Sequence, residues 1–251
     1  MKQLVWDLPT RLFHWALTLA ILLAYAFSFT RPPSSLIFSL HVVLGVVAAL
    51  LLAWRLVWGF VGSKHARWGA LAVSPREIVN YLLSVVRRRG TYYAGHNPGS
   101  AAASWAMFVL IVLTIVSGVL MNAPNRTWRQ VHELAPNLLL VILAFHIVGT
   151  TLATLMHKEN YIKAMFTGLK RAQPEQAIAH AHSGAAIVMT AWVVLGTLYF
   201  VGGFDRTTGV FTPPGTTLAL QVSERPRARR PRPPGQPGPD AIERAPIREP
   251  L

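Results

Sequence analysis

The stretch His132-Glu-Leu-Ala-Pro-Asn-Leu-Leu-Leu-Val-Ile-Leu-Ala-Phe-His146 places two histidines fourteen residues apart in a largely apolar segment. On an ideal α-helix this step turns through about 1,400°, roughly 40° short of four full circles, and rises about 21 Å. The two imidazoles would therefore face nearly the same way, separated by most of the ~30 Å depth of a bilayer core. Ionisable side chains are costly inside a membrane and usually mark a functional site. The spacing therefore predicts two sites on one membrane helix.

The composition of the whole chain also indicates a membrane protein. Of its 251 residues, 52% are hydrophobic and only 14% are charged, whereas soluble domains carry about 25% charged residues. Five apolar segments are long enough, or nearly so, to span a bilayer: 12–29, 36–60, 104–121, 136–156 and 183–203. We predict an all-α, multi-pass transmembrane helical bundle. Its parts would be a four-helix core at 1–172, a fifth transmembrane helix with its lead-in at 173–203, and a disordered Pro/Arg-rich tail at 204–251.

The basic residues gather in two connections and predict the orientation of the bundle. Residues 62–103 hold six Lys or Arg against the single acid Glu77, and residues 157–172 hold four against Glu159. Positive residues favour the cytoplasmic side, so the N-terminus would be cytoplasmic and the C-terminus periplasmic. The net charge of +14 therefore follows the membrane topology and does not predict a nucleic-acid partner. The first apolar stretch lacks a clean small-residue cleavage site, so we expect it to be retained.

Two of the cytoplasmic segments are expected to be short surface helices. The first would begin after Ser74, with Pro75 in its first turn and Glu77 completing a capping box. The second would cover residues 160–171, where apolar and basic residues alternate around a helix.

The absence of cysteine limits the cofactor chemistry. The sequence contains no cysteine, which excludes disulfides, thiolate-bound iron–sulfur clusters and covalent c-type haem. A cofactor must then be held noncovalently, with histidine as the strong nitrogen ligand.

Topology places the histidines at matching depths. His14 in the first span and His146 in the fourth would lie toward the cytoplasm, and His41 in the second span and His132 toward the periplasm. A single histidine at a membrane interface is often only an anchor. Four histidines at two matched depths are hard to explain as four separate anchors. A tetrahedral metal site needs more ligands close together, whereas two nitrogens suit the axial positions of a haem. We predict two noncovalent haem b groups, ligated by His14 with His146 and by His41 with His132.

Arginines near the cytoplasmic side could bind haem propionates. Arg55 follows His41 by fourteen residues, so it lies on nearly the same face at cytoplasmic depth. An arginine in a span needs an anionic partner, and a propionate offers bidentate geometry; the alternative is that Arg55 snorkels to the interface. Arg11 and Arg67 are weaker candidates. Gly45 and Gly149, close to His41 and His146, would let a flat macrocycle approach.

Pro136 complicates the helix that carries His132. Its ring would clash with the His132 carbonyl and remove a helix hydrogen bond. Either the helix is kinked beside its ligand, or it begins at Pro136 with His132 in the preceding turn. In the second case the two histidines share a face only approximately.

These residues together resemble the prokaryotic di-haem cytochrome b561 family, which includes the membrane cytochrome b subunits of nickel–iron hydrogenases. The resemblance covers roughly residues 4 to 171 and departs from the family at Pro136. It is carried by these motifs: Trp-Asp-Leu-Pro-Thr-Arg-Leu-Phe-His-Trp at 6–15, His41 with Gly45, residues 54–67, Tyr-Ala-Gly-His-Asn-Pro-Gly at 93–99, His132-Glu133 with His146, and His-Lys-Glu-Asn at 157–160.

The resemblance implies a function for the bundle and a place for a quinone. The family passes electrons between a quinone pool and a redox partner through two b haems. In the related cytochrome b subunits of formate dehydrogenases, the quinone sits near an Asn and a Gly before the third helix; Asn97 and Gly99 occupy that place here. The alternative is that Asn-Pro-Gly is only a turn ahead of a helix. His65, His96 and His157 carry no clear signal.

The leading hypothesis is an electron carrier in a prokaryotic cytoplasmic (inner) membrane. Electrons would cross between a quinone and a periplasmic cytochrome or dehydrogenase subunit, so the chain would serve as the cytochrome b subunit or partner of an oxidoreductase. Whether the chain is itself an enzyme stays open. One alternative is a stand-alone quinol or superoxide oxidase. Another is a histidine-lined metal-ion transporter, although no Asp or Glu lies centrally in any span.

Overall fold

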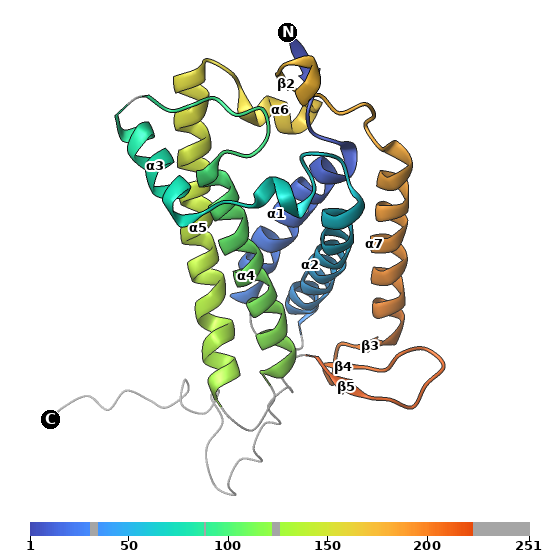
Figure 1. Cartoon of the computed structure of the whole chain (residues 1–251). Coiled ribbons are helices and arrows are strands. Elements are labelled where there is room, and N and C mark those ends of the chain that lie inside the picture. The colour runs from blue at the N-terminus through green and yellow to red at the C-terminus, as the bar shows by residue number, and fades with distance from the viewer. Residues whose placement is uncertain (31–34, 88, 122–125, 223–251) are drawn as a thin grey trace, which may run out of the picture.

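A computed structural model describes residues 1–30, 35–87, 89–121 and 126–222 of the chain. In this part of the chain five helices are long and apolar enough to cross a membrane. They run side by side as a bundle (Figure 1), and each contains all or most of one apolar segment expected from the sequence. The predicted multi-pass helical bundle is therefore confirmed. The five helices are α1 (Leu8–Ser28), α2 (Leu36–Val61), α4 (Pro98–Leu120), α5 (Thr127–His157) and α7 (Ser183–Gly203).

Polar caps set where three of these helices begin. Asp7 caps α1, Ser35 caps α2 and Asn97 caps α4, each accepting a hydrogen bond from a backbone N–H three residues on. Such caps satisfy donors that the first helical turn leaves free. Because Asn97 and Pro98 start a helix well, α4 begins six residues before its expected apolar segment.

The two ends of the bundle differ in what they carry. Because successive helices run in opposite directions, five termini meet at one end: the starts of α1, α4 and α7 and the ends of α2 and α5 (Figure 1). We call this the N-terminal end, because residue 1 also lies there. The opposite end carries the strands that follow α7, and we call it the hairpin end.

The helices pack as two close pairs, with α7 added to one of them. α1 packs mainly on α2, α4 packs mainly on α5, and α7 covers the α1–α2 pair. On α7, Trp192 donates from its indole N–H to the carbonyl of Leu50, 3.0 Å away. A shared core joins all five helices and includes Leu17, Leu51, Ile111, Leu139 and Met189. The outward faces carry exposed apolar side chains, as expected of surfaces that meet lipid.

Short elements cover the N-terminal end. Helix α3 (Pro75–Val86) begins with the predicted Ser74–Glu77 capping box, so the first expected surface helix is confirmed. The second expected helix is only partly present. Helix α6 (Tyr161–Thr167) ends at Gly168, whose φ of 79° reverses the chain. Residues 169–171 then form strand β2 (Leu169–Arg171), which pairs antiparallel with β1 (Lys2–Leu4). The other short elements there are the 3-10 helices η1 (Trp68–Leu71) and η2 (Pro174–Gln176).

The segment after α7 differs from the disordered tail expected from residue 204. Strands β3 (Phe204–Asp205), β4 (Val210–Phe211) and β5 (Leu220–Gln221) form a small antiparallel sheet. Asp205 holds its turn by accepting hydrogen bonds from Thr207 and Thr208. Phe211 stacks on Phe200 of α7, with ring centroids 4.9 Å apart. These local contacts explain the order up to residue 222; the rest of the expected tail, 223–251, lies outside the described residues.

Candidate functional site

Two of the predicted histidines meet near the hairpin end. His41 lies in the second turn of α2 and His132 in the second turn of α5. Their imidazole centroids are 6.1 Å apart and their planes are perpendicular. The structure thus brings together two side chains that are ninety-one residues apart in the sequence.

Backbone carbonyls fix the tautomer of both rings. His41 donates from Nδ1 to the carbonyl of Ala24 at 2.7 Å, and His132 donates from Nδ1 to the carbonyl of Thr114 at 2.9 Å. A carbonyl can only accept, so Nδ1 carries the proton in each neutral ring. Nε2 is left with a free lone pair, which is the arrangement of a metal-binding histidine.

The distance between the rings fits one metal ion between them. With metal–nitrogen bonds of about 2.0 Å, two opposite imidazole ligands have centroids roughly 6 Å apart. The observed separation of 6.1 Å matches this requirement. Gly118 of α4 makes room for the His132 ring, because a Cβ at this position would lie 2.8 Å from Cε1 of His132. The donor set and the spacing are therefore compatible with one haem iron that His41 and His132 would hold.

Helix α5 continues through Pro136. The helix spans Thr127–His157 with Pro136 inside it, so His132 does not lie in a preceding turn. Pro136 offers no N–H to the His132 carbonyl. One residue later, Asn137 donates from its side-chain amide to the Glu133 carbonyl at 2.6 Å. Of the two alternatives, the structure therefore shows the one in which both α5 histidines belong to one helix.

The second predicted pair lies toward the N-terminal end. His14 is on α1 and His146 is on α5, and the two imidazoles lie within electrostatic range of each other. Nδ1 of His14 is buried and has no hydrogen-bond partner among the described residues. A Cβ on Gly149, three residues after His146, or on Gly45, four residues after His41, would meet no atom within 4 Å beyond its chain neighbours and the backbone of its own helix. Both glycines therefore leave open space beside a histidine.

Arg55 is buried at the same end as the His14–His146 pair. Its residue exposure is 4%, and its guanidinium lies 4.5 Å from the ring centroid of Trp68 and 5.5 Å from that of Phe108. Nη1 has no hydrogen-bond partner in the described part of the chain. A snorkelling arginine would expose its charged head to water. The burial of Arg55 favours an anionic partner instead.

The two weaker arginine candidates are already engaged by the backbone. Arg11 donates to the carbonyl of Phe166 and, at 3.4 Å, to that of Asp7. Arg67 donates to the carbonyl of Gly62 at 2.9 Å. Both residues therefore stabilise the ends of α1 and α2, and neither has the unpartnered, buried guanidinium of Arg55.

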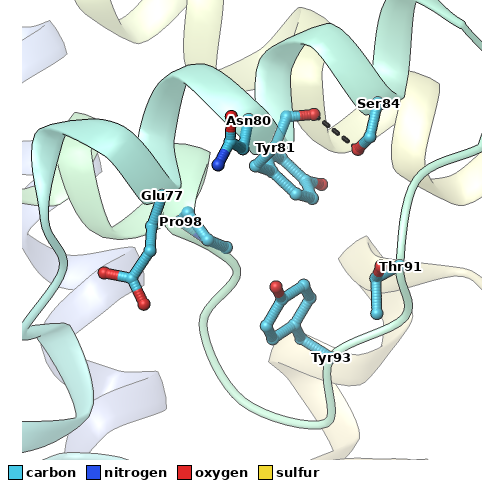
Figure 2. Close-up of a pocket in the computed structure, with 7 residues that line it drawn as sticks. All are labelled: Glu77, Asn80, Tyr81, Ser84, Thr91, Tyr93 and Pro98. Carbon is cyan, nitrogen blue, oxygen red and sulfur yellow. Dashed lines mark hydrogen bonds between the residues drawn. The ribbon is translucent and has the colours of Figure 1, made fainter.

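Asn97 and Gly99 lie beside a small polar pocket. Asn97 caps α4 by accepting the N–H of Ser100 at 2.8 Å, so Asn-Pro-Gly forms the first turn of the helix and not a turn ahead of it. A Cβ on Gly99 would lie 3.1 Å from the ring of Tyr81. Figure 2 shows the pocket between α3 and the segment before α4, with Tyr81 and Tyr93 facing each other. Its volume is about 190 Å³, and it is lined by Glu77, Asn80, Tyr81, Ser84, Thr91, Tyr93 and Pro98.

Asp7 was not singled out from the sequence, although it lies in the quoted motif at 6–15. Its carboxylate is fully buried and accepts hydrogen bonds from the N–H of Thr10 at 2.7 Å, from the indole of Trp58 at 3.3 Å and from the hydroxyl of Ser63. Trp58 and Ser63 lie at the end of α2. Asp7 therefore joins the start of the His14 helix to the end of the Arg55 helix.

Lys170 is a second buried charge that the sequence did not reveal. Its ammonium donates to the carbonyl of Tyr93 at 2.7 Å and to that of Gly95 at 3.4 Å, and it lies 4.3 Å from the ring centroid of Tyr161. Burial lowers the pKa of Lys170 to about 8, against the opposing effect of Glu159. The lysine thereby anchors the segment that precedes His96.

The described residues hold no cluster of three or more His, Cys, Asp or Glu side chains that could bind a metal ion. The four predicted ligands are arranged as two pairs.

Comparison with known proteins identifies the family. A sequence model of the prokaryotic cytochrome b561 family matches residues 5–168. The "Probable Ni/Fe-hydrogenase 1 B-type cytochrome subunit" of Escherichia coli K12 is 27% identical over 143 residues, covering 47% of this chain and 59% of the relative. The chain thus matches little more than half the length of that protein.

Two longer matches have lower identity. The "Probable Ni/Fe-hydrogenase B-type cytochrome subunit" of Bradyrhizobium diazoefficiens is 24% identical over 210 residues, covering 65% of this chain and 84% of the relative. The protein of the same name from Cupriavidus necator is 22% identical over 209 residues, covering 66% and 86%. No solved structure matches the chain. The family match, which covers more than half of the sequence, shows that the chain belongs to the prokaryotic cytochrome b561 family and is a multi-pass membrane b-type cytochrome.

Proposed function

We propose that this cytochrome carries two b haems and passes electrons across the cytoplasmic membrane between a quinone and a periplasmic redox partner. The observation that carries the proposal is the His41–His132 pair. The two imidazoles lie 6.1 Å apart, and because each Nδ1 is hydrogen-bonded to a carbonyl, the Nε2 atom of each ring would be free to hold one iron.

Four histidines and one arginine would bind the two haems. His41 and His132 would hold one haem iron, and His14 and His146 the other, nearer the N-terminal end. Arg55 would bind a propionate of the second haem. A bound haem supplies one-electron chemistry at its iron. The chain would fix the ring orientation of the ligands and hold them half-buried among apolar helices, and both effects tune the reduction potential.

The position of the two pairs supports transfer across the bilayer. One pair lies toward each end of α5, and the connections rich in Lys and Arg lie at the N-terminal end. By the positive-inside rule that end would face the cytoplasm and the hairpin end the periplasm. The names of the hydrogenase-associated relatives support a dehydrogenase of the hydrogenase type as the partner.

Haem content and spectrum test the proposal. The purified full-length protein should give a b-type reduced-minus-oxidised spectrum and contain two haems per chain. Absence of the spectrum would refute the cytochrome function and favour the metal-transport alternative. Turnover of quinol or superoxide by the purified chain alone would favour the stand-alone oxidase, whereas co-purification of a redox subunit would count against it.

We place the quinone headgroup in the pocket of Figure 2. Its volume of about 190 Å³ accommodates a single ring, and Thr91, Tyr93 and Asn80 offer polar groups around it. Ser84→Phe should fill the pocket and slow haem reduction by an added quinol at least tenfold, while dithionite still reduces all the haem.

The matched control for this variant is Val86→Phe. Val86 lies on the same helix but is 81% exposed, outside the pocket. It should leave the rate of reduction by quinol unchanged. An unchanged rate in Ser84→Phe would place the quinone elsewhere.

A further inference from the structure

Buried polar atoms without a hydrogen-bond partner gather at the N-terminal end. In the described residues such side-chain atoms are Thr10 Oγ1, His14 Nδ1, Trp54 Nε1, Arg55 Nη1 and His96 Nδ1. All five belong to the start of α1, the end of α2 or the segment before α4. A buried polar group without a partner destabilises the folded state, and native structures hold few of them. Their concentration in one region indicates a missing partner.

The missing partner is a hydrogen-bond acceptor with negative charge. An indole N–H and a guanidinium can only donate. Arg55 is also a buried cation, and a buried charge needs a counter-charge. The negative charge of the fully buried Asp7 acts on Arg55, but its carboxylate accepts its hydrogen bonds from Thr10, Trp58 and Ser63. Nη1 of Arg55 therefore still needs an acceptor.

His96 is held firmly beside this region. Its ring packs edge-on against Trp6, with centroids 4.8 Å apart. Lys170 anchors the preceding residues through the carbonyls of Tyr93 and Gly95. Burial lowers the pKa of His96 to about 3, and among the surrounding groups Arg55 has the largest effect in the same direction. His96 is therefore a neutral, positioned imidazole within electrostatic range of Arg55.

The neighbouring His65 differs from His96 in its hydrogen bonding. It also packs against Trp6, with ring centroids 6.1 Å apart. However, His65 donates from Nε2 to the carbonyl of Gln176 at 2.7 Å. Of these two neighbouring histidines, only His96 has a buried ring nitrogen without a partner.

We propose that His96 is a further cofactor-binding residue, whose Nδ1–H donates to the same haem carboxylate that Arg55 binds. The inference rests on the proposed function, because the carboxylate is a propionate of the haem held by His14 and His146. The N–H dipole of the neutral His96 ring partly offsets the electrostatic field of this propionate. Reduction of the iron adds an electron, so a weaker negative field at the iron favours the reduced form.

A potentiometric titration of the purified full-length protein tests the assignment. His96→Ala should keep the spectrum of both haems and weaken the preference of one haem for the reduced form by three- to tenfold, which lowers its midpoint potential by about 30–59 mV. The affected haem should be the one that His14→Ala removes. His96→Asn, whose amide N–H stands near the position of Nδ1, should restore most of the potential.

The double variant Arg55→Gln/His96→Ala shows whether the two residues share one carboxylate. Two groups on one anion are coupled, so the combined shift should be smaller than the sum of the single shifts. His65→Gln is the matched control and should leave the midpoint unchanged. If His96→Ala loses a haem, retention of that haem in His96→Asn supports the assignment, and its loss in both variants contradicts it.

Three results would overturn the inference while the two-haem function stands: no shift in His96→Ala, fully additive shifts in the double variant, or an equal shift in His65→Gln. Absence of haem from the unmodified protein would instead refute the proposed function itself.

Discussion

Replacing His41 with alanine should lower the haem content of the purified protein from two per chain to one, and His14→Ala should remove the other haem. Each iron would depend on two protein nitrogens, because the chain has no cysteine to replace them. His41 and His132 lie at the hairpin end, whereas His14 and His146 lie toward the N-terminal end. Loss of one ligand should therefore empty one site and leave the other loaded. Haem per chain and the reduced-minus-oxidised spectrum measure both effects.

Double variants distinguish the proposed pairing from other pairings. His41→Ala/His132→Ala should still retain one haem, because both residues serve the same iron. His14→Ala/His41→Ala should retain none. His180→Ala, which changes an exposed histidine, is the control and should keep two haems. Retention of two haems in both His14→Ala and His41→Ala would refute the ligand assignment.

Asp7→Ala should strongly destabilise the N-terminal end of the bundle. The substitution removes the cap of α1 and the acceptor for Trp58 and Ser63. A lost cap costs about 1 kcal/mol, and each buried donor left without a partner costs about 1–3 kcal/mol. We expect a loss of at least about 3 kcal/mol, read from thermal unfolding in detergent.

Asp205→Ala is the matched control for Asp7→Ala. Asp205 also accepts several hydrogen bonds, but it is exposed and serves a turn at the hairpin end. Its loss should lower the unfolding temperature far less. Equal effects of the two substitutions would show that the Asp7 network does not hold α1 and α2 together.

The sequence predicted those helices and sites that depend on neighbouring residues along the chain. Apolar length revealed the five spans, Ser74 and Glu77 revealed the start of α3, and the fourteen-residue step placed both α5 histidines on one face. Pro136 left two alternatives open, because its steric effect permits either a helix start or a helix interior. The surrounding bundle decides between them.

Features that depend on distant contacts could not be predicted. Strand β2 forms only because β1, from the other end of the core, pairs with it. Asp7 acquires its role from Trp58 and Ser63, and Lys170 from the carbonyls of Tyr93 and Gly95. His96 carries no distinguishing sequence signal of its own. Its unpartnered nitrogen becomes visible only when neighbouring segments have been placed around it.

The short ladder between β1 and β2 has a consequence for biosynthesis. Val5 and Trp6 donate to the carbonyl of Gly168, and Leu8 donates to that of Ala181. The bond to Ala181 cannot form until residue 181 has been synthesised. By then four of the five spans have been made. The segment before α1 therefore gains these hydrogen bonds only after most of the spans have been made. The backbone contacts that precede the His14 helix therefore form only after the chain that carries His41 and His132 has been made.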